Sequence, residues 1–192
     1  MVLALVLSLA GDVFLMLHGL FIPGLVSFLG AHLAYIALFR LGVPWFARRG
    51  ALVATLAVGT AMYAFLWAGG LPAALRGPVA AYVLVIALMA AQALGRARAL
   101  GTSAARMVAV GACLFMVSDS LLATSRFVQP LPMAQFWVLS TYYAAQVLIV
   151  WGWLREPVSA PADAAPRVDA PEGMQATHAL LDHRRAVPNR PV

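Results

Sequence analysis

The sequence alternates between long apolar runs and short polar segments, and this pattern predicts six helices. The runs are continuous, and several approach the ~20 apolar residues that a helix needs to cross a bilayer. Backbone groups in lipid are satisfied only within a helix or a closed barrel, and continuous runs favour the helix. We therefore expect an all-α, polytopic transmembrane bundle with helices at about residues 2–17, 21–39, 51–68, 78–95, 104–124 and 133–154.

The last part of the sequence has a different character. From Pro157 to Val192 it is rich in proline, alanine and charge and has little periodicity, which is typical of a disordered segment. We expect two parts, a transmembrane domain over residues 1–156 and a disordered cytoplasmic tail over residues 157–192.

Composition places the protein in the membrane class. Of 192 residues, 63% are hydrophobic and only 10% are charged, whereas a soluble domain carries about 25% charged residues. The first run has no positively charged segment before it, so we expect no cleavable secretory signal. It is also short, so we expect either a short first helix or a sequence that begins partway into a longer one. The single cysteine, Cys113, excludes an intramolecular disulfide.

The positive charges are distributed unequally between the two ends of the predicted helices. All thirteen basic residues are arginines. The end that carries both termini holds Arg40, Arg48, Arg49, Arg96, Arg98, Arg106 and Arg155, and the opposite end holds only Arg76 and Arg126. By the positive-inside rule, the N- and C-termini are predicted to be cytoplasmic, with the protein in the cell (plasma) membrane. Arginines placed between apolar runs do not indicate a nucleic-acid partner.

Two carboxylates stand inside apolar runs, Asp12 in LAGDVFLML and Asp119 in LFMVSDSLLA. An ionised aspartate at the bilayer centre costs about 2.5–3.5 kcal/mol on insertion scales, so each must face a cavity, a partner or the other. Two carboxyl groups in one apolar site do not readily both ionise, so one can serve as acid and the other as base. The structural alternative is that each fixes helix packing through neighbouring hydroxyls or an arginine.

Two further helices carry polar groups on one face. In residues 21–39, His32 and Tyr35 lie one turn apart on a face that also holds several aromatics. In residues 133–154, Tyr142 and Gln146 are one turn apart and suit substrate positioning or an oriented water, with interhelical hydrogen bonding as the alternative.

The motifs of several large enzyme classes are absent. The sequence has no glycine-rich phosphate loop, no GxSxG, no HExxH and no CxxC. We therefore predict no cofactor and no metal, although Asp12, Asp119 and His32 together are a conceivable minor alternative as metal ligands.

Four stretches carry a family resemblance. Gly11-Asp12, FIPGLVSFLGAHLAYIALF, GACLFMVSDSLLA and TYYAAQVLI follow one another at helix-sized intervals and cover the whole predicted membrane part. Together they resemble the YhhN family of integral membrane proteins, the lysoplasmalogenases. Members typically have eight helices and a Lys-Pro motif in the second. This sequence has no lysine, so the resemblance implies that the first two helices are lacking.

The resemblance implies an ether hydrolase that cleaves the vinyl ether bond of lysoplasmalogens to a fatty aldehyde and a glycerophospho-base. On this hypothesis Asp12 and Asp119 are the catalytic acid and base, in an order that the sequence leaves open. His32, Tyr35, Tyr142 and Gln146 would line the polar end of the cavity. The expected partners are the lysophospholipid and the bilayer. The competing readings are a proton-coupled transporter and an inactive lipid-binding relative.

Overall fold

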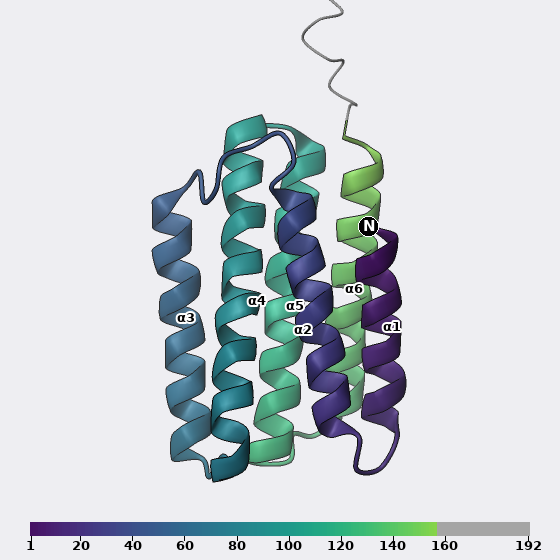
Figure 1. The fold of residues 1–192 in the computed structure, drawn as a ribbon, viewed down its shortest axis with the longest axis vertical. Coiled ribbons are helices and arrows are strands. Elements are labelled where there is room, and N and C mark those ends of the chain that lie inside the picture. Colours follow the sequence, from purple (N-terminus) through teal and green to yellow (C-terminus); the bar gives the residue numbers. More distant parts are fainter. Residues whose placement is uncertain (157–192) are drawn as a thin grey trace, which may run out of the picture. The chain divides into compact units, whose positions relative to one another are not determined.

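The structure is a computed structural model, and it describes residues 1–156. These residues form six helices and no strand, which confirms the predicted all-α fold class. The helices run side by side along a common direction, alternately up and down (Figure 1). They are α1 (Val2–Met16), α2 (Phe21–Phe39), α3 (Arg49–Ala68), α4 (Ala73–Leu100), α5 (Ser103–Phe127) and α6 (Ala134–Leu154). The predicted tail, 157–192, lies outside the described residues.

The helix α4 is longer at both ends than its apolar pattern suggested. It begins at Ala73 rather than Pro78, because one helical turn precedes the proline. It ends at Leu100 rather than at Gly95, and Gly101, with a φ of 67°, caps it. Gly95 lies inside the helix, where a Cβ atom would come within 3.1 Å of the Ala47 nitrogen. Its missing side chain therefore lets the α2–α3 loop pass close to the helix.

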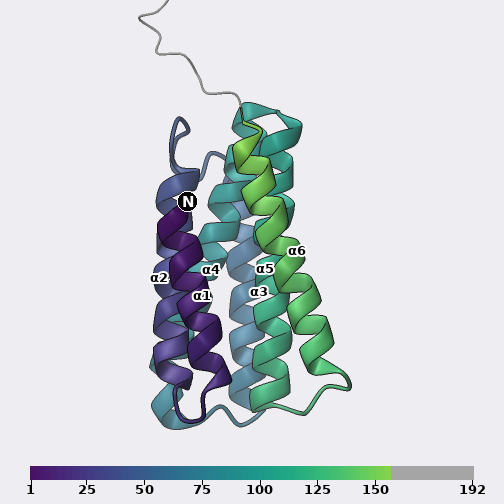
Figure 2. The ribbon, with the colours of Figure 1, turned by 90° about the vertical axis from the view of Figure 1, so that its right-hand side faces the viewer.

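Helices α5 and α6 form the closest pair in the bundle and lie together in both views (Figures 1 and 2). Two glycines make this approach possible. A Cβ atom at Gly111 would lie 2.8 Å from the Ala145 carbonyl oxygen, and one at Gly152 would lie 2.7 Å from the Ala104 carbonyl oxygen. Small residues at helix interfaces allow backbones to pack closely in membranes. Glycine is thus required at both positions by the neighbouring backbone.

The outer surface of the described helices suits lipid. Helices α2, α3, α4 and α5 are long and apolar enough to cross a membrane, and α1 is a shorter apolar helix. Helix α6 is not in this group because its tyrosines, tryptophans and glutamines lower its mean hydropathy. Large apolar side chains face outward, among them Val53 and Val147, which are 67% and 62% exposed. Such a surface is that of a membrane-embedded protein.

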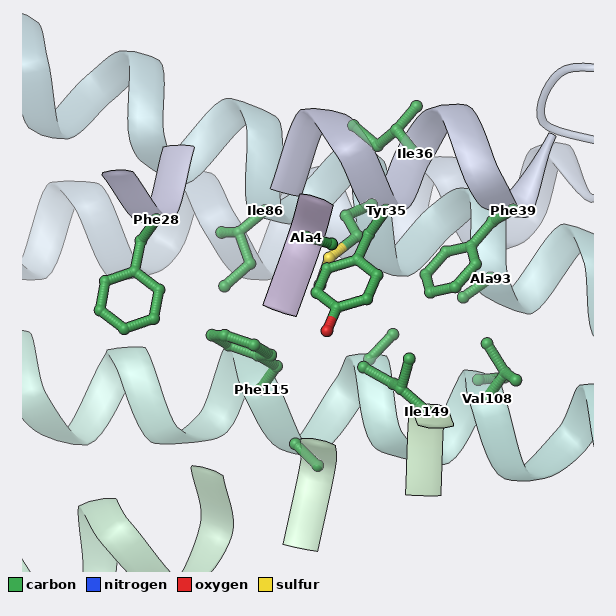
Figure 3. Close-up of a cluster of buried hydrophobic side chains, with 14 of the residues drawn as sticks. Ala4, Phe28, Tyr35, Ile36, Phe39, Ile86, Ala93, Val108, Phe115 and Ile149 are labelled. Atoms are coloured by element: carbon green, nitrogen blue, oxygen red, sulfur yellow. The ribbon is translucent and has the colours of Figure 1, made fainter. Parts of the chain in front are cut away.

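The core lies where α2 faces α5 and α6. Tyr35 and Phe39 of α2 point toward Phe115 of α5 and Ile149 of α6 (Figure 3), and all four are fully buried. The face of α2 that its 3- and 4-residue spacing singled out is thus the face that packs into the bundle.

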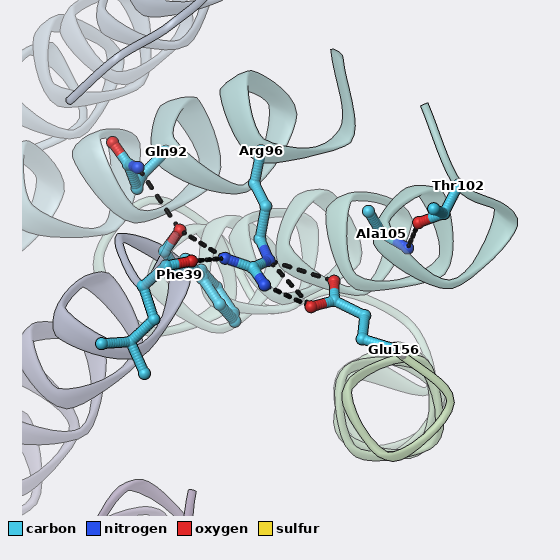
Figure 4. Close-up of polar contacts among 7 residues, drawn as sticks. Phe39, Gln92, Arg96, Thr102, Ala105 and Glu156 are labelled. Atoms are coloured by element: carbon cyan, nitrogen blue, oxygen red, sulfur yellow. Dashed lines mark hydrogen bonds and ion pairs between the residues drawn. The ribbon is translucent and has the colours of Figure 1, made fainter. Parts of the chain in front are cut away.

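Polar side chains tie one end of the bundle together. The guanidinium of Arg96 binds both carboxylate oxygens of Glu156, donates to the carbonyls of Phe39 and Leu41, and is only 6% exposed (Figure 4). The sequence pattern groups Arg96 with the loop arginines that set orientation. It lies instead inside α4 and holds the end of α2 and the end of the described part together.

The α5–α6 contact generates the first prediction. Gly111→Ala should lower the thermal unfolding midpoint of the detergent-solubilised protein, because relieving the overlap with the Ala145 carbonyl costs about 1–3 kcal/mol. The matched control is Gly50→Ala in α3, where an added Cβ meets nothing within 4 Å. An unchanged midpoint for Gly111→Ala would contradict the close packing described here.

The buried ion pair generates the second prediction. Arg96→Met should destabilise the protein by about 3–5 kcal/mol, because it leaves the Glu156 carboxylate buried without its partner. The double variant Arg96→Met/Glu156→Met removes both charges and should regain part of that loss in the same thermal unfolding measurement. Equal midpoints for the single and double variants would show that the pairing of charges is not what matters.

Candidate active site

A small apolar cavity lies toward the end of the bundle where α5 ends. Its volume is about 70 Å³, and its walls come from the first five helices. Most of the lining is aliphatic or aromatic. The polar part of the lining consists of Tyr82, Asp119, Ser120 and Arg126. An apolar pocket with a few convergent polar groups is the usual form of a small-molecule site.

Asp119 is held at this cavity by a tyrosine of the neighbouring helix. The hydroxyl of Tyr82 in α4 donates a hydrogen bond to Oδ2 of Asp119 in α5. The other cavity hydroxyl, Ser120 Oγ, donates to the Met116 carbonyl of its own helix at 2.8 Å. The carboxyl group of Asp119 therefore has a fixed orientation, whereas the Ser120 hydroxyl is hydrogen-bonded to the backbone of its own helix.

Sequence reasoning missed Tyr82. The signal was nonetheless present, because Tyr82 and Gln92 are the two polar side chains in the apolar run 78–95. Gln92 belongs to the structural end of the bundle, where its amide bonds the carbonyls of Phe39 and Pro44. Only the packing of α4 against α5 shows that Tyr82 contacts Asp119 whereas Gln92 bonds backbone carbonyls.

Four of the predicted residues form a second polar cluster. Tyr35 donates to Gln146 Oε1 at 2.6 Å, Gln146 Nε2 donates to the Tyr142 oxygen at 3.3 Å, and Tyr142 donates to Asp12 Oδ2 at 2.9 Å. The residues come from α2, α6 and α1. Every donor in the series points toward Asp12, and such an arrangement stabilises a negative charge at its end.

His32 lies between the two clusters. It is fully buried, and neither ring nitrogen has a hydrogen-bond partner within the described residues. Its ring packs edge-on against Tyr82 at 5.2 Å and Phe115 at 4.8 Å between centroids. Phe115 in turn contacts the Tyr142 ring at 5.3 Å. His32 thus links the surroundings of both aspartates through aromatic contacts.

The two aspartates occupy different surroundings. Asp119 lines the cavity, and Asp12 does not, although Leu15, one turn farther along α1, does. Phe28 lines the cavity and also contacts the Tyr142 ring at 5.9 Å. Phe28 therefore separates the cavity from the polar cluster that contains Asp12.

The geometry also bears on the metal alternative. No three His, Cys, Asp or Glu side chains in residues 1–156 lie close enough to hold a metal ion. Asp12, Asp119 and His32 therefore do not form a common ligand set in the part of the chain that the structure describes.

Comparison with known proteins identifies relatives over the same region. The model of the YhhN family matches residues 1–153. The lysoplasmalogenase TMEM86B of Homo sapiens is 38% identical over 81% of this chain and 63% of its own length. The lysoplasmalogenase TMEM86A of Bos taurus is 35% identical over 80% of this chain and 65% of its own length. A lysoplasmalogenase of Mycobacterium bovis is 31% identical over 78% of this chain and 58% of its own length. The chain thus spans about three fifths of these relatives. No solved structure matches.

Proposed function

The chain belongs to the YhhN family, and we propose that it is a membrane-embedded ether hydrolase that cleaves the vinyl ether bond of lysoplasmalogens. The products are a fatty aldehyde and a glycerophospho-base. Relatives named lysoplasmalogenases support the activity. The observation that carries the proposal is a hydrogen-bonded carboxyl group, Asp119 with Tyr82, in the wall of a mostly apolar cavity.

The reaction needs an acid that can reach carbon. Hydrolysis of a vinyl ether begins when a proton is transferred to the carbon β to the ether oxygen, which leaves an oxocarbenium ion. We assign this transfer to Asp119, because its carboxyl group meets the cavity where an apolar alkenyl group would lie. Tyr82 holds Oδ2 and leaves Oδ1 free to face the substrate.

The second half of the reaction needs water and a base. Water adds to the carbon beside the ether oxygen and gives up a proton, which forms a hemiacetal. The hemiacetal hydroxyl then loses its proton as the carbon–oxygen bond to glycerol breaks, the glycerol oxygen takes a proton, and the aldehyde is released. We assign the base to Asp12, whose cluster borders the cavity at Phe28, since the donors of that cluster stabilise its negative charge.

The remaining predicted residues then act through the two aspartates. Tyr142 contacts its carboxylate, and Gln146 and Tyr35 orient Tyr142. His32 supports Tyr82 by ring packing on the other side. In this proposal these side chains are positioning residues, and substrate contact falls to the residues of the cavity.

The orientation in the membrane is part of the proposal. The end of the bundle with α1's N-terminus also carries the arginines of the α2–α3 and α4–α5 connections, Arg96 excepted because it is paired inside the fold. Arg76 and Arg126 lie at the opposite end, where the cavity is. We propose that both termini are cytoplasmic in the cell membrane and that the cavity lies in the outer half of the bilayer.

The catalytic assignment predicts the effect of two substitutions. Asp119→Asn and Asp12→Asn should each reduce aldehyde release from a vinyl ether lysophospholipid by about 10²–10⁴-fold, the usual contribution of general acid–base catalysis. The measurement is aldehyde formation by purified protein, with thermal unfolding as a check on folding.

The matched control for these variants is Thr141→Val. The Thr141 hydroxyl bonds only carbonyls of its own helix, next to Tyr142 in sequence. The Thr141→Val variant should therefore keep wild-type activity. Full activity in a folded Asp119→Asn variant would exclude Asp119 as the acid, and full activity in Asp12→Asn would exclude Asp12 as the base.

The orientation predicts the behaviour of reporter fusions. Green fluorescent protein fused to either terminus should fluoresce, because it folds in the cytoplasm, and alkaline phosphatase at the same positions should be inactive. Active phosphatase together with dark fluorescent fusions would place both termini outside and the cavity in the inner half of the bilayer.

A further inference from the structure

One charged residue of the cavity has no part in the mechanism above. Arg126 lies in the last turn of α5 and lines the cavity together with Asp119, Ala123 and Phe127 of the same helix. Asp119, Ala123 and Arg126 are spaced by 4 and 3 residues, and Phe127 follows Ala123 by 4, as on a single helix face. The cavity therefore runs along α5 from Arg126 at the helix end to Asp119 deeper in the bundle.

The charge of Arg126 is unneutralised within the described residues. Its guanidinium lies over the Phe21 ring, 4.3 Å from the centroid, and no hydrogen bond or ion pair engages it in residues 1–156. The three acids of that part are engaged elsewhere, Asp12 by Tyr142, Asp119 by Tyr82 and Glu156 by Arg96. A guanidinium that lies over an aromatic ring still has N–H groups available for an anion.

We propose that Arg126 binds the phosphate of the lysophospholipid while Asp119 meets its vinyl ether, an inference that rests on the proposed function. Asp119 and Arg126 are seven residues apart, which is about 10.5 Å along a helix. The substrate has a matching length. Seven bonds separate the carbon that takes the proton from the phosphorus, which is about 8 Å for an extended chain, and a hydrogen bond to a phosphate oxygen adds about 3 Å.

Binding of the phosphate by Arg126 predicts which part of the head group the site recognises. A guanidinium fork matches phosphate oxygens and repels an ammonium group. No acid of residues 1–156 is free at this end to bind the ammonium of choline or ethanolamine. The site should therefore select for the phosphodiester and treat the two bases alike.

The alkenyl chain has an apolar route beyond the cavity. The cavity shares Met116 and Ser120 with a groove between α3 and α5. Val58 and Val117 line that groove and are 57% and 47% exposed, so it opens to the lipid around the bundle. A chain longer than the cavity can thus extend into the bilayer while the head group stays at Arg126.

The experiment compares two substrates with the same alkenyl chain, a lysophosphatidylcholine and an alkenylglycerol that lacks the phosphate. In the purified full chain, Arg126→Gln should raise KM for the phospholipid by about ten-fold or more, the loss of a hydrogen bond to a charged group. It should leave kcat and the KM for the alkenylglycerol nearly unchanged, and Arg126→Lys should fall between. Wild-type protein should give similar KM values for choline and ethanolamine substrates.

Arg76→Gln is the matched control. Arg76 carries the same charge at the same end of the bundle, over the Trp67 ring, but does not line the cavity. Its KM for the phospholipid should remain that of the wild type. An unchanged KM in Arg126→Gln, or an equal rise for both substrates, would overturn the proposal.

A binding measurement separates this inference from the proposed function. If wild-type protein releases aldehyde from neither substrate, the proposed function fails, and a non-cleavable alkyl lysophosphatidylcholine tests Arg126 on its own. The wild type should bind it at least ten-fold more tightly than the matching alkylglycerol, and Arg126→Gln should lose that preference. Equal affinities in the wild type would overturn the role of Arg126 as well.

Discussion

The arrangement depends on how two carboxyl groups are accommodated in a bundle surrounded by lipid. Each of the two is hydrogen-bonded by a tyrosine from another helix, Asp119 by Tyr82 and Asp12 by Tyr142. The first bond joins two helices that pack directly. The second bond joins α6 to α1. The Cα atoms of these two helices do not come within 8 Å of each other, because α1 packs on α2 instead. The tyrosine side chain spans that separation, so the need to satisfy a carboxylate connects helices that apolar packing leaves apart.

Much of the fold follows from the sequence because lipid restricts the choices. Continuous apolar runs gave six helices in the right order, and residue spacing gave the buried face of α2. The same reasoning fails at Gly95 and Pro78, which it marks as the ends of a helix although α4 continues past both. A glycine or proline indicates the end of a helix only if no tertiary contact requires that residue. At Gly95 the nearby backbone of the α2–α3 loop requires a glycine.

The site could be predicted in part for a related reason. Polar residues in apolar runs are few, so Asp12, Tyr142 and Gln146 stood out, and they do lie together. Their partners could not be read in the same way. Spacing shows which residues share a face of one helix, but not which helix that face meets. For this reason spacing does not identify Tyr82 as a partner of Asp119, and it assigns the buried Arg96 to a loop.

The amide of Gln146 gives the Asp12 cluster a direction. Its oxygen accepts from Tyr35 and its nitrogen donates to Tyr142, so the hydroxyl proton of Tyr142 is left for Asp12. An ionised glutamate at this position would have nearly the same shape but no donor. It would compete with Asp12 for that proton and place a second negative charge beside it. What this position requires is therefore an ordered sequence of donors and acceptors, which a side chain of the same shape does not provide.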